Sequence, residues 1–194
     1  NSIRRASRTV RIDFAHEKFK DRIALLRNDE MHLLIEYHCA DVEHVKSHYE
    51  QQGILAVQIS NEPLVVWGKR FLLEGRESLD PLQLKDLSIM LSSDASSPMS
   101  TLISELPDVL GFAPKIFVSP ARSAAQYSYS GHKHSVFVLP QSYINKEIFT
   151  SRDDMCAVPL AGDAIPCRGI VLANMKGKAF GLLEPLVRAA EVEG

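Results

Sequence analysis

Residues 10–35 read VRIDFAHEKFKDRIALLRNDEMHLLI, and the spacing of their apolar side chains decides the fold class. Residues 10–14 alternate apolar and charged side chains, which is typical of a strand with one buried face. Residues 17–28 then carry apolar side chains at helical spacing, and residues 32–37 form an apolar run typical of a strand covered on both faces. The stretch therefore predicts two parallel neighbouring strands joined by a helix in a right-handed crossover.

The rest of the chain continues this alternation of strands and helices. The segment Ser60-Asn61-Glu62-Pro63 is typical of a turn, and Pro107 is expected to kink or end its helix early. Trp67 and Phe71 are expected to pack at a junction between two lobes, with crossings at residues 63–69 and 151–158. The alternation predicts an α/β fold with mixed sheets. Further helices are predicted at residues 41–52, 99–110, 121–129 and 180–190, and further strands at 54–60, 64–69, 88–91, 115–119, 135–139, 155–160 and 169–173.

Composition and charge exclude several classes of protein. The chain has 194 residues, of which 45% are hydrophobic and 24% charged, unlike disordered, collagen-like or coiled-coil chains. A net charge of -2 argues against nucleic-acid binding through a broad basic surface. Three cysteines without CxxC spacing argue against a disulfide framework and favour a reducing cytoplasm. No apolar run reaches the ~18 residues of a membrane span, and no export signal is visible, so we expect a cytoplasmic protein without membrane contact.

Motifs for catalysis, cofactors and metals are absent from the sequence. It contains no G-x-G-x-x-G, no P-loop and no G-x-S-x-G, so we expect no cofactor and no enzymatic activity. The 7 histidines raise the question of a metal site, because His38, Cys39, His44 and His48 fall in one segment. His44 and His48 lie one helical turn apart, and we expect them on a solvated helix face rather than at a metal. We therefore expect no metal.

Three stretches stand in an order and at a spacing that resemble a known family. The first is residues 10–35. The second is NEPLVV at 61–66 with LKDLSIML at 84–91, and the third is VFVLPQS at 136–142 with the apolar segments and helix that follow it. They are similar to motifs of the effector-binding regulatory domain of LysR-type transcriptional regulators. That resemblance implies a two-lobed fold, shared with type II periplasmic binding proteins, with a ligand cleft between the lobes.

The resemblance also implies a domain organisation. Lobe I would begin with residues 1–64, lobe II would comprise 65–152, and residues 153–194 would return to lobe I and end in a helix. The winged helix-turn-helix of the family, its first strand and most of its first helix are not visible in this chain. Asn28 and Asp29 stand where the family has Gly, and His32 stands where it commonly has Asp.

Ligand-binding residues implied by the resemblance lie at the carboxyl ends of strands and at helix N-termini, where free N–H groups suit an anion. The serine-rich segment equally fits plain helix capping, and the segment that begins at Tyr129 equally fits a polar loop. The implied residues are Ala15, His16 and Glu17, then His38, then Ser92, Ser93, Asp94, Ser96 and Ser97, and finally Tyr129, Ser130, Gly131 and His132.

By this resemblance the chain is an effector-sensing domain that binds a small anionic metabolite and transmits the event through lobe and dimer rearrangement. Its implied partners are a second copy in a homodimer, or a tetramer in the full-length protein, and DNA only through the missing N-terminal domain. One alternative is a solute-binding receptor of a transport system on the same fold. A hydrolase that uses the histidines is the other. The identity of the effector does not follow from the sequence.

Overall fold

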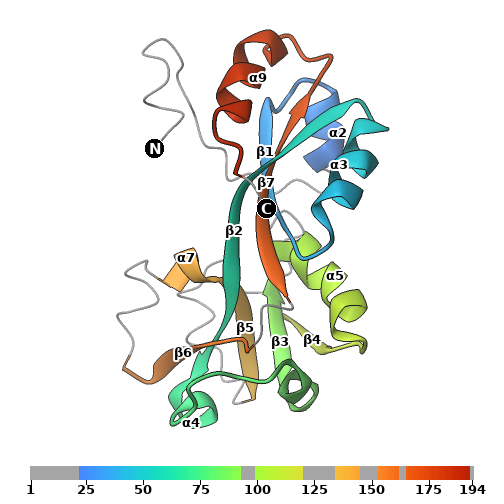
Figure 1. Cartoon of the computed structure of the whole chain (residues 1–194). Helices are drawn as coiled ribbons and strands as arrows, with labels where there is room; N and C mark the ends of the chain where they lie inside the picture. Colours follow the sequence, from blue (N-terminus) through green and yellow to red (C-terminus); the bar gives the residue numbers. More distant parts are fainter. Residues whose placement is uncertain (1–21, 93–98, 120–133, 145–152, 162–164, 193–194) are drawn as a thin grey trace.

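The computed structural model of the chain describes residues 22–92, 99–119, 134–144, 153–161 and 165–192. Its elements form two halves joined by one long strand, β2 (Ile54–Lys69), which runs through both (Figure 1). Residues 54–63 of β2 belong to the first half and residues 64–69 to the second, because they pair with different strands. Within the described ranges, no helix is long and apolar enough to cross a bilayer.

The first half is a small sheet covered on both faces by helices. β1 (Leu33–His38) and β2 both pair antiparallel with β7 (Pro166–Asn174), which lies between them. Ile54 and Ala56 of β2 face one core, and the alternate residues Leu55 and Val57 face another. Because both faces are buried, these strands read as continuous apolar runs. One core packs against α2 (Arg22–Arg27) and α3 (Val42–Glu50), and the other against α9 (Phe180–Arg188).

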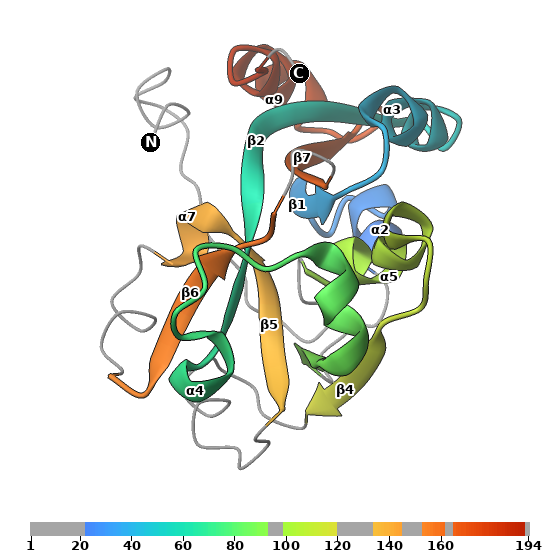
Figure 2. The same cartoon turned by 60° about the horizontal axis from the view of Figure 1, so that its bottom comes forward.

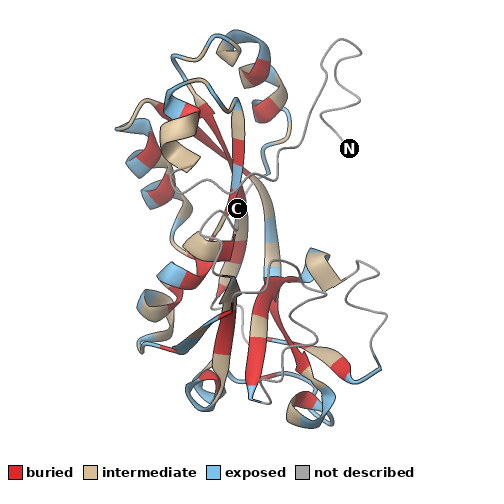
Figure 3. Ribbon diagram, turned by 180° about the vertical axis from the view of Figure 1, so that it is seen from behind, coloured by how far each residue is buried: buried red, intermediate tan, exposed pale blue. Residues whose placement is uncertain are grey.

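The second half is a mixed sheet. Residues 64–69 of β2 pair antiparallel with two strands, and the remaining pairs of strands are parallel. The strands are β3 (Ser88–Ser92), β4 (Lys115–Ser119), β5 (Ser135–Pro140) and β6 (Met155–Pro159). The helices are α4 (Arg70–Leu73), α5 (Met99–Leu110), α7 (Gln141–Ile144) and a 3₁₀ helix (Pro81–Asp86). Figure 3 shows buried residues concentrated along the strands of both halves. The predicted α/β class with mixed sheets is confirmed.

Two local predictions are wrong, and a third is wrong in one of its two alternatives. Ser60 to Pro63 form no turn: they continue β2, because residues 166–169 of β7 pair with them, with a bulge between Gln58 and Ser60. Pro107 does not end its helix, since α5 extends to Leu110, and the alternative of a kink at Pro107 stays a prediction. Phe71 lies on α4 with 64% of its surface exposed, whereas Trp67 is buried beside Phe137 in the core of the second half.

Other parts of the prediction stay untested. The predicted first strand, residues 10–14, and the predicted helix at 121–129 lie outside the described residues. In the second half, β6 pairs with residues 65–69 of β2. In the first half, β7 pairs with residues 54–63 of β2. The lobe boundaries at residues 64/65 and 152/153 remain predictions.

Candidate functional site

The end of β1 leads directly into the start of α3. His38 is the last residue of β1, Cys39 and Ala40 follow, and Asp41 is the N-cap of α3. The Asp41 carboxylate accepts hydrogen bonds from the backbone N–H groups of Glu43 and His44, at 3.0 and 3.1 Å. This cap fixes the point at which α3 begins.

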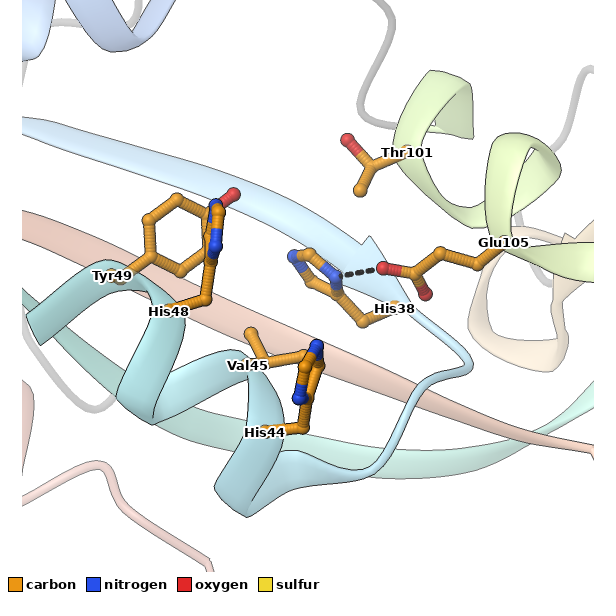
Figure 4. A pocket seen from close by; sticks show the side chains of 7 residues that line it. All are labelled: His38, His44, Val45, His48, Tyr49, Thr101 and Glu105. Atoms are coloured by element: carbon orange, nitrogen blue, oxygen red, sulfur yellow. Dashed lines mark hydrogen bonds and ion pairs between the residues drawn. The ribbon is translucent and has the colours of Figure 1, made fainter. Parts of the chain in front are cut away.

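A carboxylate from the second half contacts this connection. Glu105 lies on α5, which packs against β1 (Figure 2). His38 Nδ1–H donates to Glu105 Oε1 at 2.6 Å, as the dashed line in Figure 4 marks. The backbone N–H groups of Cys39 and Ala40 donate to Glu105 Oε2 at 2.8 and 3.0 Å. We call these three donors, on His38, Cys39 and Ala40, the carboxylate cradle.

The cradle belongs to a larger buried network of charges. Glu36 on β1 is 3% exposed and forms an ion pair with Arg22 of α2 at 2.9 Å. The hydroxyl of Tyr49 on α3 donates to Glu36 at 2.7 Å, and His38 Nε2 lies 3.6 Å from the same carboxylate. Positive and negative charges thus alternate along the network, in the order Arg22, Glu36, His38 and Glu105. Such pairing is what allows charged groups to be buried.

These neighbours fix the protonation of His38. Burial of the imidazole opposes its protonation, but the carboxylates of Glu105 and Glu36 outweigh burial and raise the pKa of His38 to about 9. Burial alone would raise the pKa of Glu105, but His38 and the amides of Ala40 and Cys39 hold that pKa below its ordinary value. The pKa of Glu36 is likewise lowered, since His38, Tyr49 and Arg22 outweigh its burial. At neutral pH, the protonated imidazole of His38 therefore faces the ionised carboxylate of Glu105.

A pocket of about 220 Å³ lies beside the cradle. Figure 4 shows the rings of His44 and His48 rising from α3 on the side of His38, with Thr101 across from them on α5. His44 and His48 are exposed, which confirms the expectation of a solvated helix face. In the part of the chain that is described, no three His, Cys, Asp or Glu residues are arranged to hold a metal ion. The pocket is lined by His38, His44, Val45, His48, Tyr49, Thr101 and Glu105.

Most of the predicted ligand-binding residues lie outside the described ranges. His38 is described, and it stands at the junction of the two halves. Ser92 ends β3, although its side chain is not described. The residues outside the described ranges are Ala15, His16, Glu17, Ser93, Asp94, Ser96, Ser97, Tyr129, Ser130, Gly131 and His132.

Four residues of the network are absent from the predicted site: Arg22, Glu36, Tyr49 and Glu105. Glu36 interrupts an apolar run that was predicted to be covered on both faces, and a buried carboxylate needs partners. A charged residue within this apolar run is therefore a sequence signal for a charged network at β1. Nothing local in the sequence identifies Tyr49 or Glu105 as the groups that contact it.

Comparisons with known proteins identify the fold. A scan against protein-family models and a search of curated proteins find no match. Among solved structures, the chain is similar to full-length CbnR in complex with its target DNA, with 13% identity and a TM-score of 0.68. The match covers 97% of this chain and 62% of CbnR, so the chain spans less than two thirds of that regulator. CbnR is a LysR family transcriptional regulator.

The chain has the fold of a LysR-type effector-binding domain. The effector-binding domain of QuiR in complex with shikimate is 17% identical, with a TM-score of 0.61 over 87% of this chain and 76% of that one. The reduced OxyR regulatory domain from Pseudomonas aeruginosa is 16% identical, with a TM-score of 0.58 over 86% and 75%. The predicted LysR-type, two-lobed fold, shared with type II periplasmic binding proteins, is thereby confirmed.

Proposed function

We propose that the chain is the effector-sensing regulatory domain of a LysR-type transcription factor. The observation that carries this proposal is the junction at His38 and Glu105, where three hydrogen bonds to one carboxylate join the two halves. A ligand that binds one arrangement of the halves better than another shifts their equilibrium. The LysR-type fold supports the same function.

The proposed effector is a small anionic metabolite that binds between the halves. The protonated His38 supplies a positive charge at this position. The proposed contacts are the residues that the resemblance implies, in the segments around residues 15–17, 38, 92–97 and 129–132. The proposed lobes comprise residues 1–64 with 153–194, and residues 65–152.

The partners of the chain follow from the same proposal. It would form a homodimer, or a tetramer in the full-length protein, and would contact DNA through an N-terminal domain. CbnR was crystallised with its target DNA, which supports this arrangement. The proposed regulator has no enzymatic activity, needs no cofactor and acts in the cytoplasm.

The direct test is to read the coding sequence upstream of the codon for Asn1. We expect a segment with helix-turn-helix periodicity and clustered Arg and Lys. An apolar signal sequence with a small-residue cleavage site would overturn the proposal in favour of an exported solute-binding receptor. A thermal-shift screen of organic acids and neutral metabolites against the chain would then identify the effector class.

A further inference from the structure

The carboxylate of Glu105 is bound in the way that a protein binds a small acid. All three donors of the cradle come from the first half, and the acceptor comes from α5 in the second half. Charge-assisted hydrogen bonds from an imidazolium and two amides are strong and directional. Glu105 therefore acts as a ligand that the chain itself supplies.

Contacts other than those of Glu105 hold the cradle in place. Glu36 lies 3.6 Å from the far nitrogen of His38, which is buried and makes no hydrogen bond. Arg168 of β7 donates to the carbonyl oxygen of Ala40 at 2.8 Å. These neighbours belong to the first half, so their contacts with the cradle do not depend on Glu105.

A free carboxylate can reach the cradle from the side of His38, which lines the pocket. The Glu105 side chain is 21% exposed, and it lines the pocket together with His38. A volume of about 220 Å³ accommodates a small organic acid. His44, His48 and Thr101 line the same space and offer further polar contacts to the body of such a molecule.

We propose that the cradle is a binding site for small carboxylates, occupied by Glu105 in the described arrangement, from which an entering carboxylate displaces Glu105 and detaches α5 from β1. Binding of a carboxylate depends only on the cradle. The consequence for regulation rests on the proposed function, because it assumes that the arrangement of the halves carries the signal.

The test is chemical rescue of a cradle that lacks its internal ligand. Glu105→Ala removes the carboxylate, and sodium formate is the probe, with sodium chloride at equal ionic strength as reference. We expect formate at about ten times its Kd to raise the Tm of this variant by about 3–6 °C. Wild type should respond far less, and so should Glu184→Ala, which removes a surface carboxylate on α9. The double variant Glu105→Ala/His38→Gln should lose the response.

A folded Glu105→Ala variant with no specific response to formate would overturn the proposal. If that variant does not fold, titration of the wild-type protein with acetate at concentrations high enough to compete with Glu105 decides the question. Saturable changes in the amide NMR shifts of Cys39 and Ala40 would support the site, and unchanged shifts would contradict it. Neither readout involves DNA or an upstream domain, so failure of the proposed function would leave both results intact.

Discussion

His38 on β1 and Glu105 on α5 are joined by a 2.6 Å hydrogen bond that links the two halves of the molecule. The same Glu105 carboxylate accepts two backbone N–H groups, so its removal leaves three donors without an acceptor. His38 in turn lies against the buried pair of Glu36 and Arg22. The contact between the halves is therefore coupled to the charge network in the interior of the first half.

Replacing Glu105 should destabilise the chain. Breaking a buried ion pair costs about 3–5 kcal/mol, and the partial exposure of Glu105 reduces the expected loss for Glu105→Ala to about 2–3 kcal/mol. Urea unfolding measures this free energy. Glu184→Ala, which breaks an exposed i,i+4 pair with Arg188, should change it by less than about 0.5 kcal/mol. Equal effects of the two variants would show that the bridge contributes nothing.

Stability should fall as the pH rises toward 9. The pKa of His38 is about 9 in the folded chain, above its ordinary value of 6.5. A group whose pKa is raised by folding stabilises the protein fully below its unfolded pKa, and this contribution is lost as the pH rises through the folded pKa. Between pH 6.5 and 9 the free energy of unfolding should decline by up to about 1.4 kcal/mol per pH unit.

The variant His38→Gln is the control for this dependence. It should flatten the decline between pH 6.5 and 9 in urea unfolding. The lowered pKa values of Glu36 and Glu105 act at acidic pH, below this window, so they do not mask the effect. A decline of the same slope in His38→Gln would assign it to another group.

Tyr49→Phe should separate packing from hydrogen bonding in the network. The ring would keep its place, but Glu36 would lose the donor at 2.7 Å. Hydrogen bonds to charged groups contribute about 1.5–3 kcal/mol, and that is the loss expected on thermal or urea unfolding. Glu36→Ala should cost more, about 3–5 kcal/mol, because it strands Arg22 and His38. The reverse order of the two losses would contradict the described network.

Two glycines offer a matched pair of substitutions. Gly53, after α3, has a φ of +74°, and a Cβ there would meet nothing within 4 Å, so Gly53→Ala tests backbone strain alone. We expect a loss of about 1 kcal/mol. Gly181 lies within α9 and also has free space, so Gly181→Ala should stabilise the chain by about 0.5–1 kcal/mol. Thermal unfolding of both variants should give Tm shifts of opposite sign.

The sequence predicts those helices and strands that are determined by residues near one another along the chain. The period of the apolar residues placed β1, α3 and α5 to within a few residues. The continuity of β2 was missed, because the partner of residues 60–63 is β7, far away along the chain. Glu105 escaped prediction for the same reason. It lies on a helix whose apolar residues are buried, and its partners belong to another element.

The relative orientation of the two halves in solution tests the central claim most directly. Residual dipolar couplings of amides in β1, β7 and α3 define one half, and those in β3, β5 and α5 define the other. For wild type, we expect one alignment tensor to fit both halves in the described arrangement. For Glu105→Ala, we expect the halves to require different orientations or degrees of order. Identical orientation and order in the two proteins would contradict the claim that Glu105 helps to fix the arrangement of the halves.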